Sequence, residues 1–261
     1  MSITHNSNKD KEASKLSSLM KQADYLAQQG LYDEAIAEVK KAIAIFPHEP
    51  ECSVQLADLY RAQKKIGPAI EAMKTAVHLD PNNLINHEQL LEALLDVERY
   101  DEIIKRARRM LRTFPRSLYA RDVLAISYLQ KGQIDESLRL VNELINFSPR
   151  DPSYQFRKAV LLQQKGLVKA AMTAFNLTLE LDPRGDLASA ANEALASLDS
   201  YQLGRILAIA SEDVVFRTKL MRDPEAALKD RGYALSPNGI AVLRNMDVDQ
   251  LPGDKSYKTY H

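Results

Sequence analysis

Residues 31–81 read LYDEAIAEVKKAIAIFPHEPECSVQLADLYRAQKKIGPAIEAMKTAVHLDP and contain one full period of a pattern that returns along the chain. Two of its prolines, Pro47 and Pro81, are 34 residues apart, and the same interval leads to Pro115, Pro149 and Pro183. Each proline follows a short apolar segment such as AIAIFP or AVHLDP. Five prolines on one frame indicate an internal repeat.

Three further columns keep this frame and predict two helices in every repeat. A glycine column marks the turn between the helices, because a helix end favours a residue with positive φ; Lys64 and Glu98 occupy two of its positions. The glycines are Gly30, Gly132 and Gly166; the next column is Tyr32, Ile66, Tyr100, Ile134 and Val168; the small-residue column is Ala35, Ala69, Ser137 and Ala171, with Ile103 as the exception. The proline then ends the second helix.

This pattern resembles the tetratricopeptide repeat family, whose repeats are helix–turn–helix units of 34 residues. The resemblance covers five units within residues 16–185. It implies an all-α fold, a right-handed solenoid in which the first helix of each unit lines a concave surface that binds peptides or helices of partner proteins. The third unit departs from the family pattern at Leu91, Ile103 and Met110, where small residues are usual, and predicts slightly splayed packing there.

The resemblance also implies which side chains face the groove. Carboxylates occupy the middle units, whereas aromatic and aliphatic residues occupy the later ones. Such a groove would suit a protein or peptide with basic residues beside an apolar anchor. The alternative is that these acids only solvate exposed helices. The implied groove residues are Met20, Asp24, Asp58, Arg61, Glu88, Glu92, Asp96, Tyr119, Asp122, Ile126, Phe156, Arg157 and Val160.

One known groove ligand is not expected. Some family members clamp the terminal carboxylate of a chaperone tail with Lys and Asn side chains. Met20 and Asp24 stand at the first two of those positions, and Ile85 stands where another Lys would be needed.

A basic stripe is predicted on the second helix of the third unit. Lys105, Arg108, Arg109 and Arg112 follow i, i+3, i+4, i+7 spacing and share one convex face. This face could dock an acidic partner, RNA or anionic lipid. The alternative is a solvated face that nearby Asp101 and Glu102 partly neutralise. No aromatic residue is interleaved with the stripe, which weakens the nucleic-acid interpretation.

Composition favours a binding protein over an enzyme. The 35 basic and 35 acidic residues cancel, so net charge gives no reason to expect nucleic acid as the partner. The five histidines and Cys52 lack metal-ligand spacing, and no phosphate loop or nucleophile motif is present. We therefore expect no catalytic residue, metal or cofactor. No apolar run is long enough to span a bilayer, and a cytoplasmic location is predicted, with residues 1–15 as a disordered tail.

The repeat frame ends after Pro183. Residues 186–200 are predicted to form a helix that caps the solenoid, 201–246 a small helical module, and 247–261 a flexible tail. The module's helices are too short to persist alone, so its apolar side chains need a burial partner. These side chains are Val214, Val215, Phe216, Leu220, Leu228 and Tyr233. We expect the module to fold onto the end of the solenoid.

The module has a second, looser resemblance. The segment FRTKLMRDPEAALKDRGYALSPNGIAVL is similar to helical segments of nitrile-hydratase-like leader peptides, in its Asp-Pro helix start, its Gly stop and its Ser-Pro start. Besides the binding of nucleic acid or a membrane surface by the basic stripe, two functions stay open from sequence. The first is a non-enzymatic scaffold or adaptor that binds a partner in the concave groove. The second is an accessory or assembly factor that docks on a peptide-modifying or other enzyme through the module.

Overall fold

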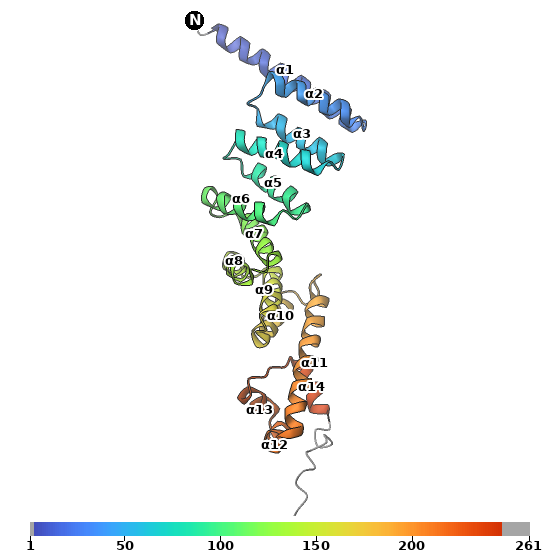
Figure 1. Cartoon of the computed structure of the whole chain (residues 1–261), viewed down its shortest axis with the longest axis vertical. Helices are drawn as coiled ribbons and strands as arrows, with labels where there is room; N and C mark the ends of the chain where they lie inside the picture. Colours follow the sequence, from blue (N-terminus) through green and yellow to red (C-terminus); the bar gives the residue numbers. More distant parts are fainter. Residues whose placement is uncertain (1–2, 247–261) are drawn as a thin grey trace, which may run out of the picture. The chain divides into compact units, whose positions relative to one another are not determined.

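The computed structural model describes residues 3–246, with side chains from residue 13 onward. Among these residues it contains fourteen α-helices and no strand (Figure 1). The chain divides into two compact units, unit 1 up to Lys131 and unit 2 from Gly132. The predicted all-α class is confirmed. The flexible tail predicted at 247–261 lies outside the described residues.

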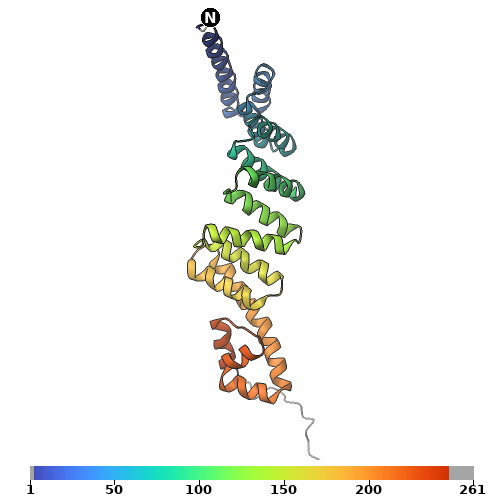
Figure 2. The same cartoon turned by 90° about the vertical axis from the view of Figure 1, so that its left-hand side faces the viewer.

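Unit 1 consists of seven helices in which successive helices pack antiparallel against each other (Figure 2). Helices α3, α5 and α7 are the first helices of repeats two to four, and in repeats one to three the first helix packs against the second. The helices are α1 (Ile3–Gln28), α2 (Tyr32–Ile45), α3 (Pro50–Ala62), α4 (Ile66–Leu79), α5 (Leu84–Asp96), α6 (Tyr100–Thr113) and α7 (Leu118–Gln130).

Unit 2 holds the rest of the repeats and the C-terminal helices. Helices α8, α9 and α10 complete the repeats, α11 follows them, and α12 to α14 lie beside the second half of α11 (Figures 1 and 2). The helices are α8 (Ile134–Phe147), α9 (Pro152–Gln164), α10 (Val168–Leu181), α11 (Ala188–Glu212), α12 (Val214–Arg222), α13 (Pro224–Asp230) and α14 (Pro237–Asn245).

The repeat columns fall where the sequence predicts them. The second helix of each repeat begins at the column that starts with Tyr32. It ends two residues before the proline of that repeat, as α2 does at Ile45 before Pro47. The bulky Ile103 is fully buried in the small-residue column, as are Leu91 and Met110 in the third repeat. The core accommodates these side chains without losing the helix pair.

The turns explain the glycine column. Gly30, Gly132 and Gly166 have φ of 77°, 71° and 72°, and Lys64 and Glu98 adopt the same left-handed conformation at 59° and 56°. The bonds that follow form a Schellman motif: the N–H groups of Lys64 and Lys65 donate to Arg61 O and Tyr60 O, both at 2.8 Å. The two non-glycine residues therefore carry backbone strain that glycine would not.

The N-terminal helix is longer than composition suggests. α1 begins at Ile3, so helical backbone covers residues that the sequence predicts to be part of a disordered tail. The prediction is corrected for Ile3 to Lys15. No proline or glycine occurs before Gly30, so no residue stops the helix from extending N-terminally from its packed second half.

The helix after the repeats is one element, not two. α11 runs from Ala188 to Glu212 without a break, whereas the sequence predicts a cap that ends near residue 200 and a separate helix after it. Its first half covers the last repeat, because Ala191, Leu195 and Leu198 pack against a core that includes Phe175. Its second half starts a different core.

That second core holds the C-terminal module together. Leu203, Ile206 and Ala210 of α11 pack against Phe216, Leu220, Ala227, Leu228 and Leu243. The module therefore buries most of its apolar side chains on α11. The expectation fails for Val214 and Val215, which are 59% and 81% exposed. They occupy the first turn of α12, on the side away from this core.

Local capping positions the module's helices. Asp213, Asp223 and Ser236 each accept a hydrogen bond from a backbone N–H three residues further on, at 2.8, 3.1 and 3.1 Å. Hydrogen bonding from Phe216 N–H is the main reason that the pKa of Asp213 lies below its ordinary value, and the charge of Arg231 contributes.

Candidate functional site

The first helices of repeats two to four bring acidic side chains together around Tyr119 of α7. Glu88, Glu92 and Asp96 lie on α5, one helical turn apart, so they share one face of that helix. Burial raises the pKa of Tyr119 to about 12, and the charges of Glu92, Glu88 and Asp96 add to the effect. The phenol therefore lies in a negative field that the charge of Arg61 partly offsets.

The contacts around this cluster leave most of its charge available. Arg61 approaches Glu92 at 3.7 Å, with the Glu92 side chain half exposed, and Ser117 Oγ lies 3.5 Å from Glu88. Asp96 is exposed at the end of α5. We call Arg61, Glu88, Glu92, Asp96 and Tyr119 the acidic face. The structure places these five predicted groove residues together.

A hollow of about 430 Å³ lies beside this face, between α1, α3 and α5. Met20, Asp24 and Asp58 line it, together with Glu51, and no Lys or Arg is among the residues that line it. Burial raises the pKa of the Asp58 carboxyl, which Arg61 partly counteracts. The buried Oε1 atoms of Gln55 and Gln89, which also line it, accept no hydrogen bond within the described residues. The hollow therefore offers acceptors and negative charge.

The remaining predicted groove residues are distributed differently. Asp122 and Ile126 are half-buried on α7. Phe156 and Arg157 belong to α9 in unit 2, where Phe156 meets Phe175 edge-on with ring centroids 5.5 Å apart. Phe156 and Val160 also pack against the core under α11. Burial lowers the pKa of Arg157. Phe156 thus contributes to the core of the last repeat, which weakens its assignment as a ligand anchor.

The basic stripe is exposed on α6 as predicted. Lys105, Arg108, Arg109 and Arg112 are all exposed, and Arg108 lies over the Tyr128 ring at 5.5 Å. The proposed neutralisation by acidic neighbours is not observed. Asp101 pairs with Lys131 at 3.1 Å. Glu102 pairs with Lys74, Arg99 and Arg106 instead.

A set of contacts between neighbouring repeats is not predicted when the sequence is analysed one helix at a time. Asp33, Asp101 and Asp135 start second helices, and each also bonds a residue at the end of the next repeat's first helix. Gln63 donates to Asp33 at 2.8 Å and Lys131 to Asp101 at 3.1 Å, and Lys165 contacts Asp135. The hydrogen bond from Gln63 and the charge of Lys65 lower the pKa of Asp33. The signal was available, because all three pairs are 30 residues apart on the repeat frame.

Polar groups that could suggest a metal site are engaged in structural contacts. His87 Nε2 lies 3.0 Å from Pro81 O, and its ring meets Phe114 edge-on. Burial raises the pKa of the Cys52 thiol, with Glu49 and Glu51 adding to it. Among the residues with described side chains, no three His, Cys, Asp or Glu residues are grouped to hold an ion.

The comparison with protein families decides the assignment. Two family models, both described as tetratricopeptide repeat, match residues 26–94 and 123–186. The chain is a tetratricopeptide repeat protein. The stretch between the matches contains most of the atypical third repeat, and neither match reaches α11 to α14. The resemblance of that segment to leader peptides gains no support from them.

Solved structures agree with the fold of this tetratricopeptide repeat protein. A crystal structure of MamA is 22% identical, with a TM-score of 0.58, covering 66% of this chain and 94% of that one. A MamA fragment from Desulfovibrio magneticus RS-1 is 17% identical, with a TM-score of 0.56, 66% coverage of this chain and 97% of that one. YrrB, described as a TPR protein with an unusual peptide-binding site, is 16% identical, with a TM-score of 0.58 and coverages of 74% and 98%.

No curated protein matches the chain. Within the described residues, no helix combines the length and the apolar character needed to cross a membrane.

Proposed function

We propose that this tetratricopeptide repeat protein is a non-enzymatic scaffold that binds a basic peptide or helix on the acidic face of unit 1. Tetratricopeptide repeats are protein–protein interaction modules, so the class of partner follows from the family. The observation that carries the finer proposal is the cluster of Glu88, Glu92 and Asp96 around Tyr119, whose charge Arg61 partly offsets. We also propose that it acts in the cytoplasm.

The electrostatics of the face give the ligand its chemistry. A Lys or Arg side chain that enters beside Tyr119 would meet three carboxylates whose mutual repulsion is relieved by a cation. The adjoining hollow, lined by Met20, Asp24 and Asp58, would receive a second basic or amide group. Ile85, which is 64% exposed at the rim of this hollow, supplies an apolar contact for the ligand.

The test uses a display library of random dodecapeptides. It is selected in parallel on the wild-type chain and on the double variant Glu92→Lys/Asp96→Lys. Peptides that only the wild type retains should be enriched in Lys and Arg. Their affinity should fall by about tenfold in the variant, because two attractive charge contacts become repulsive. Higher salt should weaken their binding to the wild type more than to the variant.

A matched control keeps the change in charge but moves it. Glu34→Lys/Glu71→Lys places the same four charge units on α2 and α4, away from the acidic face. This control should bind the selected peptides as the wild type does. If both double variants weaken binding equally, or if the selected peptides show no basic enrichment, the acidic face is not the binding site.

A further inference from the structure

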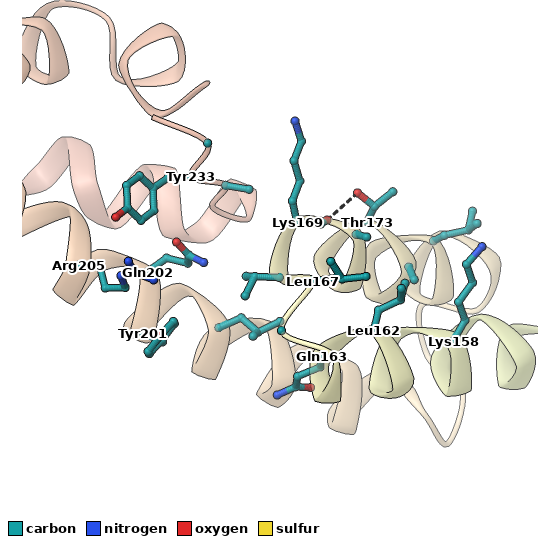
Figure 3. A pocket seen from close by; sticks show the side chains of 18 of the residues that line it. Lys158, Leu162, Gln163, Leu167, Lys169, Thr173, Tyr201, Gln202, Arg205 and Tyr233 are labelled. Carbon is teal, nitrogen blue, oxygen red and sulfur yellow. Dashed lines mark hydrogen bonds between the residues drawn. The ribbon is translucent and has the colours of Figure 1, made fainter. Parts of the chain in front are cut away.

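A second hollow, of about 1050 Å³, lies entirely within unit 2. It is formed by α9, the turn to α10, α10, the middle of α11 and the loop after α13 (Figure 3). None of the groove residues implied by the family pattern lines it, since it uses Gln155 and Lys158 of α9 where the groove uses Phe156 and Arg157. We call it the module pocket, because the C-terminal module forms one of its walls.

The charge of the module pocket is opposite to that of the acidic face. Lys158, Lys169, Arg205 and Arg231 line it, and no Asp or Glu is among its lining residues. Arg231 is paired with Asp213. The other three cations have no carboxylate partner among the residues whose side chains are described. Three uncompensated positive charges around one concave surface favour an anionic ligand.

Arg205 is held in position for such a ligand. Its guanidinium carbon lies 6.0 Å from the centroid of the Tyr201 ring and 5.7 Å from that of Tyr233. Cation–π contact with two rings fixes the planar fork of Arg205 while leaving its N–H groups able to bind a carboxylate in bidentate fashion. Figure 3 shows Arg205, Gln202 and Tyr233 together on one side of the pocket, with Leu162, Leu167 and Lys169 on the other.

Gln202 adds an independent indication of a ligand. The residue is only 6% exposed, it lines the pocket, and its Oε1 accepts no hydrogen bond from any described residue. A buried amide oxygen without a donor is unfavourable, so such an oxygen normally has a hydrogen-bond partner. The N–H of an extended peptide backbone would supply that donor.

The apolar part of the pocket fits an aliphatic side chain. Leu162 and Leu198 are buried at its floor, Val168 and Leu177 are half-buried, and Leu167 is 47% exposed at its edge. The two tyrosine rings that could stack on a nucleobase are already engaged by Arg205, which favours a peptide over a nucleic acid. We propose that the module pocket binds an acidic peptide segment that carries an aliphatic residue between its carboxylates.

The test again uses random dodecapeptides, now selected in parallel on the full wild-type chain and on the triple variant Lys158→Gln/Lys169→Gln/Arg205→Gln. Peptides that only the wild type retains should be enriched in Asp, Glu and aliphatic residues. By fluorescence anisotropy, a fluorescein-labelled peptide from this set should bind about two- to fivefold more weakly to each single variant, since each loses one exposed charge contact. The triple variant should lose about tenfold or more.

Two further variants keep the result interpretable. Arg222→Gln removes the same charge from α12 outside the pocket and should leave affinity unchanged. Leu167→Glu adds a negative charge at an exposed position of the pocket edge and should weaken the acidic peptide without unfolding the chain. Circular dichroism checks that each variant keeps its helical signal.

The proposal is overturned if the selection yields no acidic peptides, or if Arg222→Gln and Arg205→Gln weaken them equally. It is also overturned if a fluorescein-labelled oligothymidylate binds more tightly than the peptides and depends on the same three cations, which would assign the pocket to nucleic acid. Because acidic peptides should be indifferent to Glu92→Lys/Asp96→Lys, a failure here is distinguishable from a failure of the scaffold proposal.

Discussion

The Asp199 carboxylate of α11 accepts two hydrogen bonds from Ser236, the residue that caps α14. Oδ1 accepts from the backbone N–H of Ser236 at 2.8 Å, and Oδ2 accepts from its hydroxyl. The same Ser236 hydroxyl accepts from the Gly239 N–H at 3.1 Å. Both residues are buried, at 6% and 4% exposed. This pair therefore connects the last element of the C-terminal module to the middle of α11.

Asp199→Ala should detach α14 while the repeats stay folded. The substitution leaves the buried N–H and hydroxyl of Ser236 without an acceptor, a loss of about 2–3 kcal/mol because the bonds involve a charged group. Hydrogen exchange should show faster exchange in α14, with α3 to α5 unchanged. Ser200→Ala, which removes an exposed hydroxyl bonded within α11, is the control. Equal protection of α14 in both variants would show that apolar packing alone holds the module.

Gly239→Ala should produce a similar effect by a different route. A Cβ at position 239 would lie 2.5 Å from both Cγ and Oδ1 of Asp199, so α14 must shift away from α11. Hydrogen exchange in α14 should again accelerate. Gly204→Ala, on the exposed side of α11 with open space around it, should leave exchange unchanged or slow it slightly, because alanine favours a helix interior. If Gly239→Ala leaves α14 as protected as the wild type, the close approach to Asp199 is not a constraint.

Replacing the strained turn residues with glycine should stabilise unit 1. A left-handed conformation costs a non-glycine residue roughly 1–2 kcal/mol, and Lys64→Gly and Glu98→Gly remove this cost. The greater entropy of glycine in the unfolded chain cancels about half of the gain. We expect a gain of about 0.5 kcal/mol each in urea denaturation. Ala62→Gly, two residues earlier at the helical end of α3, should lose up to about 1 kcal/mol. A loss of stability in Lys64→Gly would show that the left-handed conformation of Lys64 does not destabilise the folded protein.

Glu102 should make stability depend on pH in the acidic range. Partial burial raises its pKa, but hydrogen bonds from Arg106 and Lys74 and their charges outweigh this and lower it below the usual 4.5. Its contribution is therefore complete above that pH and is lost as the pH falls through the folded-state pKa. Glu102→Gln should cost about 1 kcal/mol at neutral pH and nothing once the wild-type carboxyl is protonated.

The urea midpoint of both proteins across pH 3 to 7 measures this difference. Glu71→Gln removes another carboxylate that contacts Lys74 but is 68% exposed, so it should change stability by less than about 0.5 kcal/mol. A difference between wild type and Glu102→Gln that stays constant with pH would exclude the ion pairs as its cause.

Truncation distinguishes the two packing roles of α11, whose first half covers the last repeat and whose second half packs against the C-terminal module. A chain that ends at Gly185 loses Ala191, Leu195 and Leu198 and exposes Phe175 and the rest of the last repeat's core, so it should aggregate. A chain that ends at Ser200 keeps these three residues and should remain folded with modestly lower stability. Light scattering and thermal unfolding compare the two. Equal solubility of both fragments would contradict the capping function of α11.

The sequence by itself determined the repeats and their turns. Pro47 and its equivalents end helices, Gly30 and its equivalents turn them, and Asp223 and Ser236 start short helices of the module. Each of these signals acts on backbone within a few residues, through a fixed φ, a missing N–H or a capping oxygen, and so each can be read without knowing the fold. The acidic side chains of α5 could also be assigned to one face, because helical spacing is itself local.

Only the tertiary structure decided which distant groups meet. Nothing near Asp199 in sequence indicates that it bonds Ser236, and Lys158, Lys169 and Arg205 lie on three helices with no shared pattern. Tertiary packing also joined two predicted helices into α11, since both of its halves bury apolar side chains in separate cores, and it left Val214 and Val215 exposed. Contacts across thirty or more residues depend on how whole helices pack, and hydrophobic burial, which drives that packing, is non-directional and specifies no partner in advance.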